Sequence, residues 1–194
     1  LAGDGIHYEP RWFKPWPTGR RATLEHGEQR YPIGDLTFDV GGVVLGFEIC
    51  EDAWVARRPG ASLSLQGVDV ILNPSASHFA FGKQRIRRRL VLEGSRAFGV
   101  SYLYANLLGN EAGRAVYDGG GMIAAAGNLL VETKPFSFAG MGIYDAVLDI
   151  DQTRLIRAQS ASFRPEVEGD ERCVRVSFDH NGVPPKRVDV KPEP

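Results

Sequence analysis

Apolar stretches of strand length on both sides of a helical pattern constrain the fold of this chain most strongly. Residues 43–50, 68–72 and 100–105 are mostly apolar, which is typical of strands buried within a sheet. Residues 81–98 lie between the last two and repeat apolar side chains at helical spacing. Strands connected through a helix predict an α/β domain with a mixed sheet packed on helices. The predicted buried stripe of this helix is Ile86, Leu90, Ala97 and Phe98.

The rest of the chain divides into three kinds of segment. Residues 1–35 are rich in proline, glycine and aromatic side chains without a regular period, so they predict a packed loop region. The residues after Asp151 are polar and rich in proline, which is typical of a tail or linker. Further strands are predicted at residues 36–40, 122–126, 128–133 and 145–150, and a short helix within residues 53–66.

Composition restricts the class of protein. The 194 residues, 43% of them hydrophobic and 24% charged, are enough for one domain with a core and argue against disorder. A net charge of −1 argues against a general nucleic-acid binder. No apolar run reaches the about 18 residues of a membrane span, so no membrane partner is predicted. With two cysteines, Cys50 and Cys173, no disulfide framework is expected, and the predicted location is the cytoplasm.

Cys50 is the strongest candidate for chemistry. It ends an apolar strand and precedes two carboxylates, Glu51 and Asp52. Functional sites in α/β sheets lie beyond the carboxyl ends of strands, where a thiolate can attack an amide or nitrile carbon if a base and an oxyanion donor are near. The alternative is a small core residue, as free cysteines often are. Carboxylates around Cys50, Glu48 included, would repel a thiolate unless a cation offsets them.

Other kinds of site have less support. The four histidines have no paired spacing and no Cys-x-x-Cys pair occurs, so no metal site is predicted. Residues 119–121 are three glycines without the spacing of a nucleotide-binding loop. The arginines of the predicted helix lack interleaved aromatic residues, so we expect a solvated face or a subunit contact. These arginines are Arg85, Arg87, Arg88 and Arg89.

The segment around Cys50 resembles a known family. Residues 47–52 (FEICED) resemble the nucleophile motif of the nitrilase, or carbon–nitrogen hydrolase, superfamily, in the form found in the glutaminase domain of glutamine-dependent NAD synthetases. Residues 73–77 (NPSAS), followed by Gly82 and Lys83, resemble the loop after the next strand of that domain. The resemblance covers about residues 3–150, and its other matching segments are residues 5–13, 105–111 and 117–120.

The resemblance implies a nitrilase-type α-β-β-α sandwich, with mixed sheets covered by helices, and glutamine amide hydrolysis through a cysteine thioester. The ammonia released would reach a synthetase domain in the same longer chain, and only that domain would use ATP. No cofactor is expected for the hydrolysis, and a homo-oligomer is expected. The residues implied for the site are Cys50 as nucleophile, Glu9 as the positioning glutamate, Ser77 as a glutamine contact, and Tyr8 and Phe81 as pocket residues.

The chain also departs from this family. The general-base glutamate and the oxyanion lysine of the family lie before the region that matches Leu1, and Lys14 follows the matching segment instead of preceding it. No Ser-Gly-Gly-x-Asp-Ser loop of a synthetase occurs. We therefore expect a fold incomplete at the N-terminus. Residues 1–150 are predicted to be the C-terminal two-thirds of a glutaminase domain, and residues 151–194 the end of the domain and a linker. The chain alone is expected to be nearly inactive.

Two alternative functions stay open. The first is a stand-alone amidase or nitrilase of the same superfamily that acts on another amide. The second is a binding module that retains the fold without catalysis, which the arginine-rich helix and the missing base and lysine favour. The reactivity of Cys50 towards an electrophilic glutamine analogue separates the binding module from both enzymes.

Overall fold

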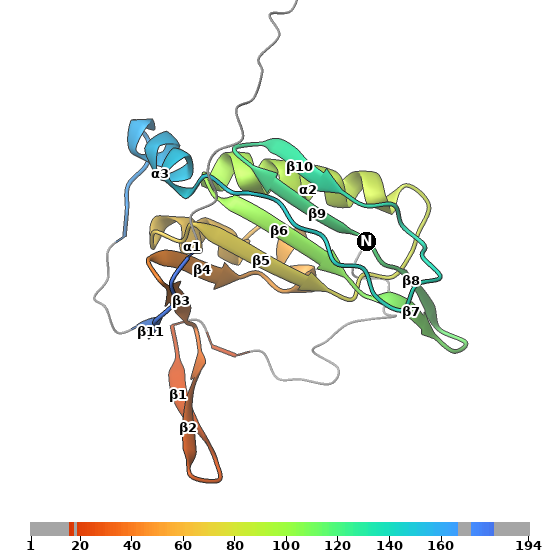
Figure 1. Ribbon diagram of the computed structural model, residues 1–194, viewed down its shortest axis with the longest axis horizontal. Helices are drawn as coiled ribbons and strands as arrows, with labels where there is room; N and C mark the ends of the chain where they lie inside the picture. The colour runs from red at the N-terminus through yellow and green to blue at the C-terminus, as the bar shows by residue number, and fades with distance from the viewer. Residues whose placement is uncertain (1–15, 18, 167–171, 181–194) are drawn as a thin grey trace, which may run out of the picture.

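A seven-stranded mixed sheet forms the body of the molecule (Figure 1). The computed structural model describes residues 16–17, 19–166 and 172–180 of the 194. The three strands β4, β5 and β6 run parallel to one another in the middle of the sheet. Strand β3 is antiparallel to β4, β9 is antiparallel to β6, and β10 is antiparallel to β9, while β11 is parallel to β3. The strand order and bounds are β10 (Asn128–Glu132), β9 (Gly121–Ala125), β6 (Ser101–Asn106), β5 (Val70–Ser75), β4 (Val43–Phe47), β3 (Thr37–Val40) and β11 (Cys173–Val176).

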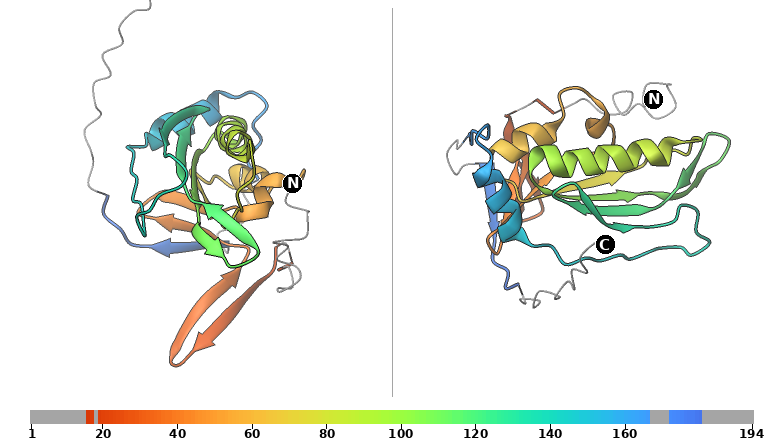
Figure 2. Two further views of the ribbon diagram at one scale, coloured as in Figure 1. Left: turned by 90° about the vertical axis from the view of Figure 1, so that its right-hand side faces the viewer. Right: turned by 90° about the horizontal axis from the view of Figure 1, so that it is seen from above.

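Two helices cover one face of this sheet. Helix α1 (Pro59–Leu65) connects β4 to β5, and helix α2 (Lys83–Phe98) connects β5 to β6, so each joins parallel neighbours. The views in Figure 2 place both helices on the same side of the strands. The mixed α/β class that the sequence predicts is therefore confirmed. The buried apolar cluster between these layers consists of Leu63, Val68, Ile71, Val91, Val100, Tyr102, Tyr104, Met122 and Ala124.

Helix α2 confirms the predicted helix but buries a different face. Ile86 is 43% exposed and Ala97 is exposed, so the predicted apolar stripe is wrong at these two positions. The prediction assumed that charged side chains face solvent, whereas two cations of this helix lie in the core. The buried residues of α2 are Lys83, Arg87, Val91, Gly94 and Ser95.

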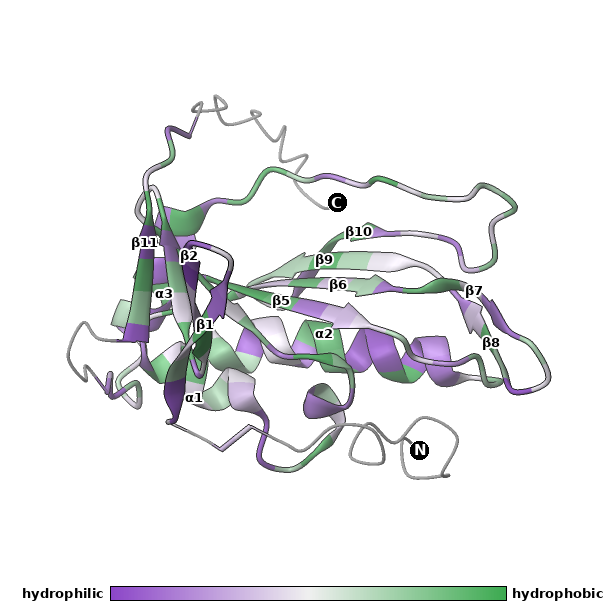
Figure 3. Ribbon diagram, turned by 90° about the horizontal axis from the view of Figure 1, so that it is seen from below, coloured by the Kyte–Doolittle hydropathy of each residue, from purple (hydrophilic) through white to green (hydrophobic). Residues whose placement is uncertain are grey.

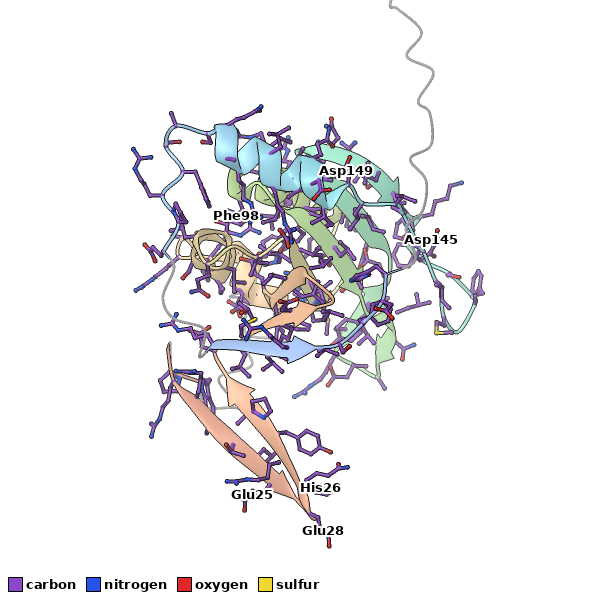
Figure 4. The ribbon with its side chains drawn as sticks, turned by 60° about the vertical axis from the view of Figure 1, so that its left-hand side comes forward. Glu25, His26, Glu28, Phe98, Asp145 and Asp149 are labelled. Carbon is purple, nitrogen blue, oxygen red and sulfur yellow. The ribbon has the colours of Figure 1, made fainter. Side chains whose placement is uncertain are left out.

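A strap of residues 134–149 crosses the other face of the sheet and leads from β10 to α3 (Ile150–Gln159), as Figures 1 and 3 show. The strand predicted at residues 145–150 is wrong, because this part of the strap is extended without sheet partners and helix α3 begins at Ile150. Asp149 caps that helix, since its Oδ1 accepts a hydrogen bond of 2.8 Å from the Gln152 N–H. Figure 4 shows Asp149 at the start of α3.

Two hairpins project from the sheet. Strands β1 (Arg21–His26) and β2 (Gln29–Gly34) are antiparallel and pair only with each other, and Figure 4 shows Glu25, His26 and Glu28 at the tip, away from the sheet. The loop predicted for residues 1–35 is therefore wrong within this hairpin. Almost all of the hairpin is exposed on both faces, so it carries no alternation of apolar residues that a sequence could reveal. The second hairpin is β7 (Leu108–Glu111) with β8 (Ala115–Asp118).

The C-terminal part of the described chain is attached to the sheet. Strand β11 extends the sheet beside β3, and α3 is fixed by Arg157, whose Nη2 donates to Asp69 Oδ1 at 2.7 Å. The tail predicted after Asp151 therefore contains a helix and a strand, while residues 181–194 lie outside the described part of the chain. Within the described residues, no helix has both the length and the apolar character that crossing a membrane requires.

Candidate active site

Cys50 occupies a tight turn just beyond the carboxyl end of β4. The strand ends at Phe47, three residues earlier than predicted, and a 3-10 turn covers Cys50–Trp54. Cys50 has φ of 47°, a left-handed conformation that is uncommon for residues other than glycine and is often found at functional sites. The carboxylate Oδ2 of Asp52 accepts a hydrogen bond of 2.9 Å from the Ile49 N–H, which holds the turn closed. The predicted position of the thiol at a strand end is confirmed.

Glu48, two residues before Cys50, points into the core. Its side chain is fully buried, and its Oε2 accepts hydrogen bonds from Arg58 Nη2 at 2.6 Å and from the Tyr102 hydroxyl at 2.5 Å. Its Oε1 accepts a further hydrogen bond of 3.0 Å from the Gly60 N–H. Burial, followed by the charge of Glu48, raises the pKa of Tyr102, so this phenol stays a donor. Because Arg58 neutralises Glu48, this carboxylate does not act as an unpaired negative charge beside the thiol.

The loop after β5 brings Ser77 to the same edge of the sheet. Ser77 is buried, and its backbone N–H donates to Asn106 Oδ1, at the end of the parallel strand β6, at 2.8 Å. On the other side, Arg87 Nη2 donates to the Ser77 carbonyl at 2.8 Å. The carboxyl ends of β4, β5 and β6 lie at one edge because these strands are parallel. We call this edge the Cys50 end of the sheet.

A small pocket joins the Cys50 turn to the Ser77 loop. Its volume of about 20 Å³ is roughly that of one water. Residues from three segments line it, namely Cys50, Glu51, Trp54, Ala76, Ser77, His78 and Lys83.

Lys83 brings a positive charge to this pocket. The side chain is 7% exposed, and its Nζ lies 3.4 Å from His78 Nε2 and 5.7 Å from the centre of the Trp54 ring. A buried ammonium in a thiol pocket offsets the carboxylates near Cys50 and favours negative charge on a bound substrate. Lys83 belongs to a segment that resembles the family, but the resemblance implies no role for it. The burial of Lys83, and of Arg87 one turn later in α2, shows only in the structure.

The structure brings together only part of the predicted site. Cys50 and Ser77 line one pocket. Phe81 does not reach it, because its side chain is 97% exposed and its ring contacts that of Phe79, with centroids 5.4 Å apart. Tyr8 and Glu9 lie outside the described residues. Among the residues that the structure describes, no group of three or more histidine, cysteine, aspartate and glutamate side chains is arranged to hold a metal ion.

A larger hollow of about 500 Å³ lies on the opposite face, between the sheet and the strap. Its walls are mostly apolar and include Phe47, Leu103 and Ile143. Cys50 does not line it. The thiol and the buried lysine therefore share the smaller of these two hollows.

Known proteins are similar in sequence to this chain over most of its length. No family model matches the chain. The glutamine-dependent NAD(+) synthetase of Mus musculus is 33% identical over an alignment of 189 positions that covers 92% of this chain. This chain is a homologue of glutamine-dependent NAD(+) synthetases. The synthetase of Saccharomyces cerevisiae is 31% identical over an alignment of 170 positions that covers 81% of this chain. The chain spans about a quarter of the length of these relatives, 26% and 23% respectively.

Solved structures of glutamine-dependent NAD(+) synthetases share the fold. The structure from Cytophaga hutchinsonii is 46% identical and matches with a TM-score of 0.63, covering 72% of this chain and 22% of that chain. The structure from Acinetobacter baumannii, at 17% identity and a TM-score of 0.54, covers 90% of this chain and 38% of that chain and shows likeness of fold alone. The α/β fold class expected from the nitrilase resemblance is confirmed.

Proposed function

We propose that Cys50 hydrolyses the side-chain amide of glutamine and so supplies ammonia for NAD synthesis. The observation that carries the proposal is the thiol pocket, in which Cys50 in a left-handed turn faces Ser77 and the buried ammonium of Lys83. The homology to proteins named glutamine-dependent NAD(+) synthetases supports glutamine as the amide. A reactive thiol needs a nearby positive charge and neighbouring groups that are held in place, and the residues that line the pocket provide both.

The reaction has two halves. The Cys50 Sγ attacks the amide carbon, the carbon–nitrogen bond breaks, and the nitrogen leaves as ammonia after it takes up a proton, which leaves a thioester on Cys50. Water then adds to the thioester carbon, the carbon–sulfur bond breaks, and glutamate and the thiol are released. In this scheme Lys83 favours a negatively charged part of the substrate, and Ser77 contacts glutamine. Glu9 is proposed to position the reacting groups, and Tyr8 to line the pocket.

The proposal extends to the whole protein. We propose that the ammonia is used by a synthetase domain of the same polypeptide, since the relatives carry that name and the chain spans about a quarter of their length. ATP would serve that domain, while the hydrolysis would need no cofactor. The general-base glutamate and the oxyanion lysine would come from residues that precede the matching region. A homo-oligomer and a cytoplasmic location also stay predictions.

Substitution of the two cysteines tests the proposed function. The protein is expressed from its complete coding sequence as wild type, Cys50→Ala and Cys173→Ala, and ammonia release from glutamine is measured. We expect Cys50→Ala to lose at least about 10³-fold in kcat, because the nucleophile is removed. Cys173→Ala is the matched control, since Cys173 lies on the edge strand β11 and should leave kcat unchanged.

Mass spectrometry with an electrophilic glutamine analogue provides the second readout. The analogue should modify Cys50 and not Cys173. Ammonia release by the Cys50→Ala variant at the wild-type rate would refute the proposal. Labelling without turnover of glutamine, combined with hydrolysis of other amides, would favour a stand-alone amidase. Absence of both labelling and hydrolysis would favour a binding module.

A further inference from the structure

Arg87 and Asp118 form an ion pair that is buried behind the thiol pocket. Arg87 lies on α2 and Asp118 ends β8, and their side chains are only 1% and 2% exposed. The guanidinium Nη1 donates to both carboxylate oxygens, at 2.8 and 2.7 Å. The prediction that Arg87 lies on a solvated face or at a subunit contact is therefore wrong. Neither residue lines the pocket, so any effect on the reaction must pass through other residues.

The remaining donors of Arg87 hold one wall of the pocket. Its Nη2 donates to the carbonyl of Ser77 at 2.8 Å, to the Ser77 hydroxyl at 3.2 Å and to the carbonyl of His78 at 2.9 Å. Ser77 and His78 both line the pocket that contains Cys50. A planar guanidinium with fixed donor directions imposes one position on these acceptors, which a lysine with a single point charge cannot do.

Asn106 completes the support from the other side. Its Oδ1 accepts a hydrogen bond of 2.8 Å from the Ser77 N–H, and its Nδ2 donates to Ser77 O at 3.1 Å and to Asp118 Oδ1 at 3.2 Å. The N–H and the carbonyl of Ser77 are thus both hydrogen-bonded, by the side chains of Arg87 and Asn106. Both of these side chains also bind Asp118. Such a wall has one arrangement in place of the several that a loop usually samples.

We propose that Arg87 and Asp118 are positioning residues that fix the Ser77–His78 wall at its working distance from Cys50. The inference rests on the proposed function, because the wall matters only if Cys50 reacts with a substrate held against it. Stability alone does not explain the pair, since a buried ion pair is often no more stabilising than apolar residues of similar volume. Most donors of Arg87 point at the wall, and a shift of about 1 Å in such a wall can cost about 10²-fold in rate.

The test compares Arg87→Lys with Arg157→Lys in the protein expressed from its complete coding sequence. Arg157 is the matched control, because it is also a buried helix arginine bound to a buried aspartate, but at the opposite end of the sheet. Hydrogen exchange is measured first, since it does not depend on any substrate. We expect the amides of residues 76–78 to exchange at least about tenfold faster in Arg87→Lys and at the wild-type rate in Arg157→Lys.

Kinetics with glutamine provide the second measurement. We expect Arg87→Lys to lower kcat/KM about 10- to 100-fold, mainly through a higher KM, while Arg157→Lys keeps both constants within about twofold after correction for the folded fraction. If Arg87→Lys does not fold, Asp118→Asn, which keeps the size of the side chain, replaces it. Unchanged exchange at residues 76–78, or equal losses of kcat/KM in the two variants, would overturn the inference. A wild-type protein that releases no ammonia would instead refute the proposed function, while the exchange result would still decide whether Arg87 orders the wall.

Discussion

Two buried arginine–aspartate pairs attach helices to opposite ends of the same sheet. At the Cys50 end, Arg87 of α2 binds Asp118 at 2.7 Å. At the other end, Arg157 of α3 binds Asp69, which directly precedes β5, also at 2.7 Å. We call this second edge the Asp69 end of the sheet. All four side chains are at most 8% exposed, so solvent screening differs little between the pairs.

The two pairs differ in what else their members hold. The other partners of Asp69 are the Val44 N–H at 3.0 Å and Arg154 Nη2 at 2.6 Å, and Arg157 also donates to the Val68 carbonyl at 2.5 Å. These groups belong to the sheet and to α3, and none lines either hollow of the described structure. The Arg87 pair instead binds Ser77 and His78, which line the pocket that contains Cys50. The same kind of ion pair therefore contacts only the sheet and α3 at one end, and the lining of the candidate site at the other.

The largest effect is expected when a buried carboxylate is neutralised at each end. Glu48→Gln leaves Arg58, whose side chain is 13% exposed, without its counter-ion, and Asp69→Asn does so to the buried Arg157 and to the partly exposed Arg154. Breaking a buried pair in this way costs about 3–5 kcal/mol, so both variants should unfold at lower urea concentration. Only Glu48→Gln should also lower kcat, because Glu48 lies two residues before Cys50.

Urea unfolding followed by fluorescence gives the stability loss, and turnover of glutamine per folded molecule gives the loss in kcat. The Asp69→Asn variant serves as the control for lost stability without a change in the pocket. If the two variants lose kcat equally, the division between a structural end and a reactive end is wrong.

The order of strands and helices was predictable because it depends on apolar periodicity. Residues 68–72, 81–98 and 100–105 fall on β5, α2 and β6 with small shifts of their bounds. The position of the Cys50 thiol was predictable for the same reason, since Cys50 follows an apolar strand. The hairpin of β1 and β2 was not, because nearly all its side chains are exposed and no period results.

The support of the site could not be predicted from the sequence. A charged residue on a helix is normally assigned to solvent, and only tertiary contacts bury Arg87 and Lys83. Asp118 lies 31 residues from Arg87, and no local pattern indicates their pairing. The sequence indicates Glu48 only as one of several charges around the thiol. In the structure, Arg58, ten residues later, binds the Glu48 carboxylate in the core, so this charge does not face the pocket.

A smaller effect should separate two buried tyrosines of β6, Tyr102, whose hydroxyl reaches Glu48, and Tyr104. The Tyr102 hydroxyl donates to Glu48 and accepts from Asn73 Nδ2 at 3.0 Å, whereas the buried Tyr104 hydroxyl makes no hydrogen bond of acceptable geometry in the described structure and has only a weak polar neighbour in the Ser75 side chain. Tyr102→Phe leaves buried groups unsatisfied and should cost about 1–3 kcal/mol. Tyr104→Phe removes an unsatisfied hydroxyl and should be neutral or stabilise by up to about 1 kcal/mol.

Thermal or urea unfolding of both variants measures these changes. Each variant is the control for the other, because both replace a buried tyrosine of the same strand by phenylalanine. A Tyr104→Phe variant as destabilised as Tyr102→Phe would show that the Tyr104 hydroxyl makes a hydrogen bond of equal strength. The hydrogen bond to Glu48 would then not distinguish the two tyrosines.

The smallest expected effect is a loss of stability in alkali that arises at the Cys50 end. Burial raises the pKa of Tyr104 to about 12 from an ordinary value of 10.0. The unfolded chain then loses this proton at lower pH than the folded chain, so the contribution to stability is complete below pH 10 and is lost as the pH rises towards 12. By pH 11 the loss from this group is on the order of 1 kcal/mol. At the Asp69 end, the hydrogen bond with Asp69 raises the pKa of Arg154, so its charge persists through this range.

The difference between wild type and Tyr104→Phe isolates this contribution. Urea unfolding at pH 9 and pH 11 should show a steeper loss of stability for wild type, by on the order of 1 kcal/mol, because the phenylalanine variant has no proton to lose at this position. Ultraviolet absorbance at high pH checks the cause, since ionisation of Tyr104 should coincide with unfolding and not precede it. Equal pH dependence in the two proteins would mean that Tyr104 ionises normally in the folded state. In that case water reaches the interior behind the thiol pocket, and the Cys50 end is less tightly closed than the Asp69 end.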